Sequence, residues 1–191
     1  MKSEEHRSLY FEKAGEEATD ALLAYVQDYA RKKGIQDVVV ASTTGATGAK
    51  ASKVLKGLNL VVVTHHFGFP RPGETELAEE HRREIRANGA RIATGTHALS
   101  GVERAIRRKF NTIGPTELIA HTYRTFGQGT KVCVEIALMA ADAGLIPVDR
   151  DVISIAGTGR GADTALLLRP ANSSSFFDLK IREVIAKPSD F

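Results

Sequence analysis

Short apolar runs alternate with amphipathic segments along almost the whole chain, and this alternation restricts the possible folds more than any other feature. The strand-like runs cover residues 38–41, 58–66, 90–97 and 151–157, with further candidates at 164–170 and 179–187. Strands that alternate with helices build a three-layer α/β/α sandwich around a mostly parallel sheet. We therefore expect one α/β domain spanning residues 1–191.

The segments between these runs carry the helical signals. Apolar residues repeat at helical spacing over 22–30, and Gly34 after a basic stretch is a helix-stop signal. Further helices are expected over 46–58, over 77–88 and over 115–126, with another opened by an S-x-x-E capping box at Ser100 and Glu103. The helix that begins near residue 130 is apolar almost all round, which predicts that it is buried.

Composition and charge exclude several classes of protein. The net charge of +3 is too small to indicate a nucleic-acid partner, and the basic group Arg104, Arg107, Arg108 and Lys109 is interpreted as a solvated helix face. A single cysteine, Cys133, excludes an internal disulfide and is interpreted as a buried structural residue. The charged first thirty residues contain no signal peptide, and no apolar run is long enough to cross a membrane. We expect a cytoplasmic protein.

Residues 38–50, VVVASTTGATGAK, contain the first functional signal. An apolar strand runs into hydroxyls and glycines and then into a helix, an arrangement that suits a phosphate because helix N-termini offer free amides and a positive dipole end. The segment is not a P-loop, since GATGAKAS at 45–52 lacks the G-x-x-x-x-G-K-[ST] spacing.

Other unusual loops also follow predicted strands, and in an open α/β sheet they meet where ligands bind. The start of the helix near residue 130 lies at the same edge. The charge of Lys131 there is unfavourable beside the positive end of the helix dipole, and a bound anion would compensate it. The alternative is a solvated lysine with no ligand. Arg160 could supply charge-assisted contacts to a phosphate. The residues expected to bind the ligand are Ser42, Thr43, Thr44, Gly45, Thr47, His65, Gly68, Phe69, Thr96, Gln128, Gly129, Thr130, Lys131, Gly157, Thr158, Gly159 and Arg160.

Three other kinds of site are rejected. GTGRGA at 157–162 fits a dinucleotide fingerprint, but the segment that follows leaves no room for the required helix. His65, His66 and His97 do not predict a metal site, because neighbouring strand residues point to opposite faces and no nearby carboxylate completes a ligand set. The chain contains no G-x-S-x-G motif, so a serine hydrolase has no support.

The motifs LVVVTHHFGF, TGTHALSGVERA, FGQGTKVCVEIALMAADAGLIP and FFDLKIREVIAKP resemble those of stand-alone archaeal and bacterial proteins that consist of a pyruvate kinase α/β domain. The resemblance implies a five-stranded mixed sheet of order 3-2-1-4-5 with the last strand antiparallel. It also implies that Ser42, Thr43, Thr44, Gly45 and Thr47 hold a phosphate, and that FMN, which some members carry, is the first candidate cofactor. Pyruvate kinase activity is not expected, because its catalytic barrel alone needs ~250 residues.

Three functions follow as hypotheses. The first is a protein that binds a phosphorylated, nucleotide-like small molecule; the second is a flavin-dependent oxidoreductase in which His66 or His97 donates a proton; the third is a structural or assembly module. No metal is expected, and a homo-oligomer is left open. Thr44→Ala or Gly45→Asp is expected to weaken phosphate-bearing ligands without unfolding the domain.

Overall fold

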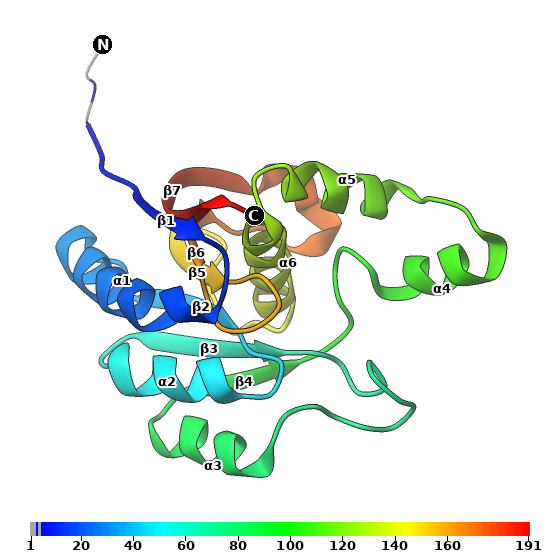
Figure 1. Ribbon diagram of the computed structural model, residues 1–191, viewed down its shortest axis with the longest axis horizontal. Coiled ribbons are helices and arrows are strands. Elements are labelled where there is room, and N and C mark those ends of the chain that lie inside the picture. Colours follow the sequence, from blue (N-terminus) through cyan, green and yellow to red (C-terminus); the bar gives the residue numbers. More distant parts are fainter. Residues whose placement is uncertain (1–2, 4) are drawn as a thin grey trace.

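The computed structural model describes residue 3 and residues 5–191, and a mixed β-sheet forms its centre (Figure 1). Within these residues seven strands lie in the spatial order β1-β7-β6-β5-β2-β3-β4. All run in one direction except β6, which is antiparallel to both of its neighbours. The strands are β1 (Leu9–Lys13), β2 (Asp37–Ala41), β3 (Asn59–Thr64), β4 (Arg91–Thr94), β5 (Val152–Ala156), β6 (Thr164–Arg169) and β7 (Lys180–Asp190).

Helices cover both faces of the sheet, as the alternation of elements predicts. Helices α1, α2 and α3 pack on one face, and α5 and α6 lie on the other, while α4 extends away from the sheet (Figure 1). The helices are α1 (Thr19–Lys33), α2 (Ala46–Val54), α3 (Glu79–Ala87), α4 (Gly101–Phe110), α5 (Pro115–Arg124) and α6 (Gln128–Asp142), with short 3-10 helices η1 (Glu16–Ala18) and η2 (Ser173–Asp178).

Strand β2 shows why the sheet is buried on both sides. Val39 faces the helix layer that contains Cys133, whereas Val38 and Val40 face the layer that contains Leu22. Alternate side chains of a strand point to opposite faces, so an uninterrupted apolar run requires cover on both. Cys133 is fully buried, as expected of a structural cysteine, and burial raises the pKa of its thiol.

The expected order of five strands is present as β4-β3-β2-β5-β6, but the prediction of a five-stranded sheet is wrong because β7 and β1 extend it. β7 falls on a strand candidate of the sequence, whereas β1 was not anticipated. β1 is a short edge strand whose partner, in register from Leu9 opposite Ala186, lies at the other end of the chain. Its stability therefore depends on a pairing that leaves no local signal.

The capping box at the start of α4 does not form. The Ser100 side chain makes no cap hydrogen bond, and Glu103 instead accepts backbone amides from the first turn of α5, Thr116 at 3.2 Å and Glu117 at 2.7 Å. Gly114 leaves the room for this carboxylate, because a Cβ there would lie 2.1 Å from Glu103 Oε1. The glutamate therefore joins two helices instead of closing its own.

The topology brings two expected loops together. From β2 the chain adds β3 and β4 on one side and then returns to place β5 on the other side of β2. The β2–α2 and β5–β6 loops therefore flank the point where strand order reverses, as expected. None of the helices in the described part of the chain combines the length and apolar character that a membrane crossing needs.

Candidate functional site

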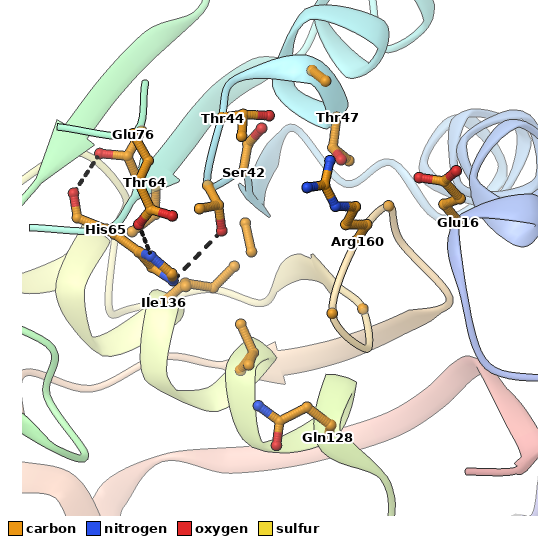
Figure 2. Close-up of a pocket in the computed structure, with 18 of the residues that line it drawn as sticks. Glu16, Ser42, Thr44, Thr47, Thr64, His65, Glu76, Gln128, Ile136 and Arg160 are labelled. Atoms are coloured by element: carbon orange, nitrogen blue, oxygen red, sulfur yellow. Dashed lines mark hydrogen bonds and ion pairs between the residues drawn. The ribbon is translucent and has the colours of Figure 1, made fainter. Parts of the chain in front are cut away.

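A cavity of about 830 Å³ opens beside this reversal point, where ligands of open α/β sheets bind. Its walls come from segments that are far apart in sequence: η1 with the start of α1, the β2–α2 loop, the residues after β3, the first turns of α6, and the β5–β6 loop. Figure 2 shows side chains from these segments converging on one space. The volume lies in the ordinary range for small-molecule sites.

The β2–α2 loop presents a helix N-terminus to the cavity. The first backbone amides of a helix have no partner within it. Here Gly48 donates its amide to Ser42 Oγ at 3.0 Å, and Ala49 donates its amide to the Gly45 carbonyl at 2.8 Å. The Ala46 and Thr47 amides of the first turn donate to no other described residue, and both residues line the cavity. The arrangement suits an anion.

Gly45 has a packing role in this loop. Its φ is 95°, and a Cβ there would lie 2.5 Å from His81 Cβ and 2.7 Å from Leu77 Cδ1, at the start of α3. Gly45 does not line the cavity. The expectation that Gly45→Asp leaves the domain folded is therefore in conflict with the structure, because both backbone conformation and space oppose a side chain.

We predict that Gly45→Asp lowers the free energy of unfolding by about 2 kcal/mol more than Gly57→Asp does. Gly57 is the matched control, because it also has a positive φ, 79°, but no atom lies within 4 Å of the position that a Cβ would take there. Both substitutions place a side chain at a positive φ, and only the first also overpacks. Urea unfolding followed by circular dichroism measures the difference, and equal losses at the two positions would contradict the packing role.

The β5–β6 loop is held by one buried carboxylate. Asp163 is fully buried, and its Oδ2 accepts the backbone amides of Thr158 at 3.0 Å and Gly15 at 3.1 Å. These bonds fix the loop that carries Arg160. Figure 2 shows the Arg160 guanidinium reaching from this loop toward Thr47 at the start of α2. A cation thus lies beside the open helix N-terminus.

Four rings, which we call the ring cluster, lie at the β3–β4 side of the cavity: His65, His66, Phe69 and His97. His65 stacks on Phe69 with 3.9 Å between ring centroids, and His97 lies 5.1 Å from His65 and 5.2 Å from His66. The Arg104 guanidinium carbon lies 4.8 Å from the Phe69 centroid, a cation–π contact. Arg104, which lines the cavity, is therefore not part of a purely solvated face.

Two arguments about the histidines were wrong. β3 ends at Thr64, so the alternation of strand side chains does not separate His65 from His66, and both rings join the ring cluster. A carboxylate also lies nearby, because Glu76 Oε2 is 2.7 Å from His65 Nδ1. In the described part of the chain, no group of three or more His, Cys, Asp or Glu side chains is placed to hold a metal ion.

The surroundings of the two histidines proposed as proton donors, His66 and His97, do not suit that role. His97 lines the cavity but is buried, and desolvation lowers its pKa to about 4, so it is neutral at pH 7. His66 is not among the lining residues, and its Nδ1 lies 2.6 Å from the Phe67 carbonyl oxygen. His97 therefore offers no imidazolium at neutral pH, and the His66 side chain does not border the cavity.

An ion pair closes the base of the cavity at the start of α6. Lys131 Nζ contacts Glu135 Oε2 with both side chains buried, and Glu135 Oε1 accepts the Leu99 amide at 2.9 Å. Desolvation lowers the pKa of Lys131 despite the neighbouring carboxylate. The solvated lysine is excluded, and the anion that compensates Lys131 comes from its own helix.

Most, but not all, of the residues expected to bind a ligand line the cavity. Those that line it are Ser42, Thr43, Thr44, Thr47, His65, Phe69, Gln128, Lys131, Gly157, Gly159 and Arg160. Those that do not are Gly45, Gly68, Thr96, Gly129, Thr130 and Thr158. Gly129 instead packs against Thr164, since a Cβ at this position would lie 2.1 Å from Thr164 Oγ1. The Thr130 hydroxyl donates to the Phe126 carbonyl at 3.2 Å.

Sequence reasoning missed the charged and apolar side chains that complete the walls. These are Glu16, Glu17, Asp20, Lys50, Glu76, Arg104, Arg124, Val132, Glu135, Ile136 and Met139. They lie on helices or in a loop without a local motif, so no pattern marks them. The apolar character of the helix near residue 130 could have indicated Val132, Ile136 and Met139, which share one face of α6.

Comparison with known proteins identifies the family. The family model described as "Pyruvate kinase, alpha/beta domain" matches residues 20–168, which is most of the chain. The chain belongs to the pyruvate kinase α/β domain family. Among solved structures it is similar to Cryptosporidium parvum pyruvate kinase in complex with ADP, at 13% identity and a TM-score of 0.41 over 80% of this chain. A second is a mutant of O-ureido-L-serine synthase with O-ureido-L-serine bound, at 21% identity and a TM-score of 0.31 over 65% of this chain.

The two neighbours are longer proteins, and the matches cover 23% of the pyruvate kinase chain and 38% of the synthase chain. This chain therefore spans less than half of the length of either neighbour. The function of the domain itself has to be argued from its own cavity.

Proposed function

We propose that this pyruvate kinase α/β domain protein binds a phosphorylated, nucleotide-like small molecule, with FMN as the first candidate. The observation that carries the proposal is the open N-terminus of α2, where the Ala46 and Thr47 amides, the Thr44 hydroxyl and Arg160 border one cavity. Backbone amides, hydroxyls and a guanidinium are the groups that proteins use for phosphate.

The rest of the cavity fits a planar ring. Phe69 and His65 supply aromatic surface, and Val132, Ile136 and Met139 of α6 supply an apolar wall. The phosphate would lie at the start of α2, and the ring would lie against these side chains. FMN, when bound, supplies electron and hydride transfer, whereas the protein residues provide binding and orientation.

The first experiment is an absorption spectrum of the purified protein, followed by titration of the ligand-free protein with FMN and with riboflavin, which lacks the phosphate. Tighter binding of FMN than of riboflavin supports a phosphate cradle. Equal or undetectable binding of both would overturn FMN as the ligand. Turnover with NAD(P)H and an electron acceptor would favour the flavin-dependent oxidoreductase over a binding protein. If neither ligand raises the Tm, the remaining hypothesis is the structural or assembly module.

We predict that Arg160→Ala raises the Kd for FMN about tenfold while leaving the Kd for riboflavin unchanged. A hydrogen bond to a charged group contributes about 1.5 kcal/mol or more, and 1.4 kcal/mol corresponds to a factor of ten. Thr44→Ala removes a neutral hydroxyl and is expected to act in the same direction with a smaller effect. Lys56→Ala, which removes an exposed cation outside the cavity, is the control. Equal weakening of both ligands by Arg160→Ala would contradict a phosphate contact.

A further inference from the structure

A hydroxyl, an imidazole and a carboxylate lie in line at the edge of the cavity. His65 Nδ1 lies 2.7 Å from Glu76 Oε2, and His65 Nε2 lies 3.5 Å from Thr43 Oγ1. All three residues line the cavity, and Figure 2 shows Glu76 beside the His65 ring. The three residues come from three different segments, so no sequence motif joins them.

The two hydrogen-bond contacts of the His65 ring have different chemical roles. A carboxylate at Nδ1 holds the proton on that nitrogen and leaves Nε2 as the acceptor that faces the Thr43 hydroxyl. A nucleophile within reach of a base that a third group orients is the geometric signature of an activated hydroxyl, and the first contact is often looser before substrate binds. The stacking of Phe69 on the ring, at 3.9 Å, also restricts its rotation.

The surroundings of Thr43 complete this arrangement. Thr43 follows β2 and precedes α2, so its hydroxyl lies on a strand-to-helix turn, and the Ala46 and Thr47 amides border the same cavity. Backbone amides at a helix N-terminus stabilise the oxyanion that forms when a hydroxyl attacks a carbonyl. His66 and His97 do not provide a comparable base, because neither has a carboxylate at hydrogen-bond distance among the described residues.

We infer that Thr43, His65 and Glu76 form a catalytic triad that hydrolyses carboxylic esters, an activity beyond FMN binding. Because both would use the Ala46 and Thr47 amides, an ester and FMN would compete for the cavity. Thr43 Oγ1 bonds to the ester carbonyl carbon while its proton moves to His65 Nε2. The ester C–O bond then breaks, and the proton moves to the leaving alkoxide to give the alcohol. Water cleaves the acyl-threonine in the same way, which releases the acid and restores the Thr43 hydroxyl. Glu76 stabilises the transient imidazolium.

The test is covalent labelling with a fluorophosphonate probe, which reacts with activated hydroxyls, followed by peptide mass spectrometry. The wild-type protein is expected to carry the adduct on Thr43. His65→Gln is expected to slow labelling about 100-fold or more, since general-base catalysis contributes at least this much, and Glu76→Gln is expected to slow it about tenfold. Thr43→Val removes the adduct and Thr43→Ser restores it. Hydrolysis of p-nitrophenyl acetate is expected to follow the same order.

Two controls separate the triad from general effects. His121→Gln removes an exposed histidine of α5, and Glu74→Gln removes the nearby carboxylate that pairs with Arg71; both are expected to label like the wild type. Circular dichroism and Tm show which variants are folded. If His65→Gln does not fold, Glu76→Gln and the Thr43→Val and Thr43→Ser pair still decide. Wild-type labelling no faster than that of Thr43→Val, or labelling unaffected by His65→Gln and Glu76→Gln, would overturn the proposal.

Discussion

Replacement of Lys131 by methionine is expected to lower the free energy of unfolding by about 4 kcal/mol. The side chains of Lys131 and Glu135 are 6% and 5% exposed and lie one turn apart in α6. Methionine keeps the length of the chain but leaves the Glu135 carboxylate buried without its cation. Removing one partner of a buried pair is costly, because the other charge keeps its desolvation penalty. Urea unfolding at pH 7 measures the loss.

A second variant shows whether the uncompensated charge is the cause. Glu135→Gln added to Lys131→Met removes the charge but keeps an oxygen to accept the Leu99 amide, so it is expected to recover about 3 kcal/mol of the loss. Lys50→Met is the surface control, since Lys50 pairs with exposed Asp20 at 2.9 Å and exposed pairs contribute about 1 kcal/mol or less. A double variant no more stable than Lys131→Met alone would show that charge burial is not responsible.

The features of the fold that have a period or a composition could be predicted from the sequence. The run Val38–Val40 is apolar because β2 is covered on both faces, and this same pattern placed the β2–α2 loop at the edge of the sheet. The position of Arg160 beside that loop followed from the same topological rule. Edge strand β1 was missed because its partner is distant in sequence.

The candidate site was less predictable, because the same residue types serve packing and binding. Ligand contacts were predicted from glycine and threonine both at Thr44 and at Gly129. Thr44 lines the cavity, whereas Gly129 packs on Thr164. The partners of His65 and Lys131 could not be predicted either. Glu76 lies in a loop without regular structure. Oppositely charged residues four positions apart also pair on exposed helix surfaces, so the spacing of Lys131 and Glu135 does not indicate burial.

As the pH falls from 7 to 4, His97 alone is expected to lower the free energy of unfolding by about 3 kcal/mol. Its pKa is about 4 in the folded protein and 6.5 without the fold. Between these values the unfolded chain binds a proton that the folded chain does not, so acid favours unfolding. Burial is the main cause of the low pKa, to which His65, His66 and Lys131 add, while Glu135 acts in the opposite direction.

The effect is isolated by comparing the wild type with His97→Gln in urea unfolding at pH 4, 5, 6 and 7. Glutamine is neutral throughout this range, so the stability advantage of the wild type over the variant should shrink by about 3 kcal/mol between pH 7 and pH 4. His121→Gln, which removes an exposed ring, should show the same dependence of the unfolding free energy on pH as the wild type. Parallel curves for the wild type and His97→Gln would show that His97 takes up its proton in the folded protein as well, and it would then be available as an acid in the cavity.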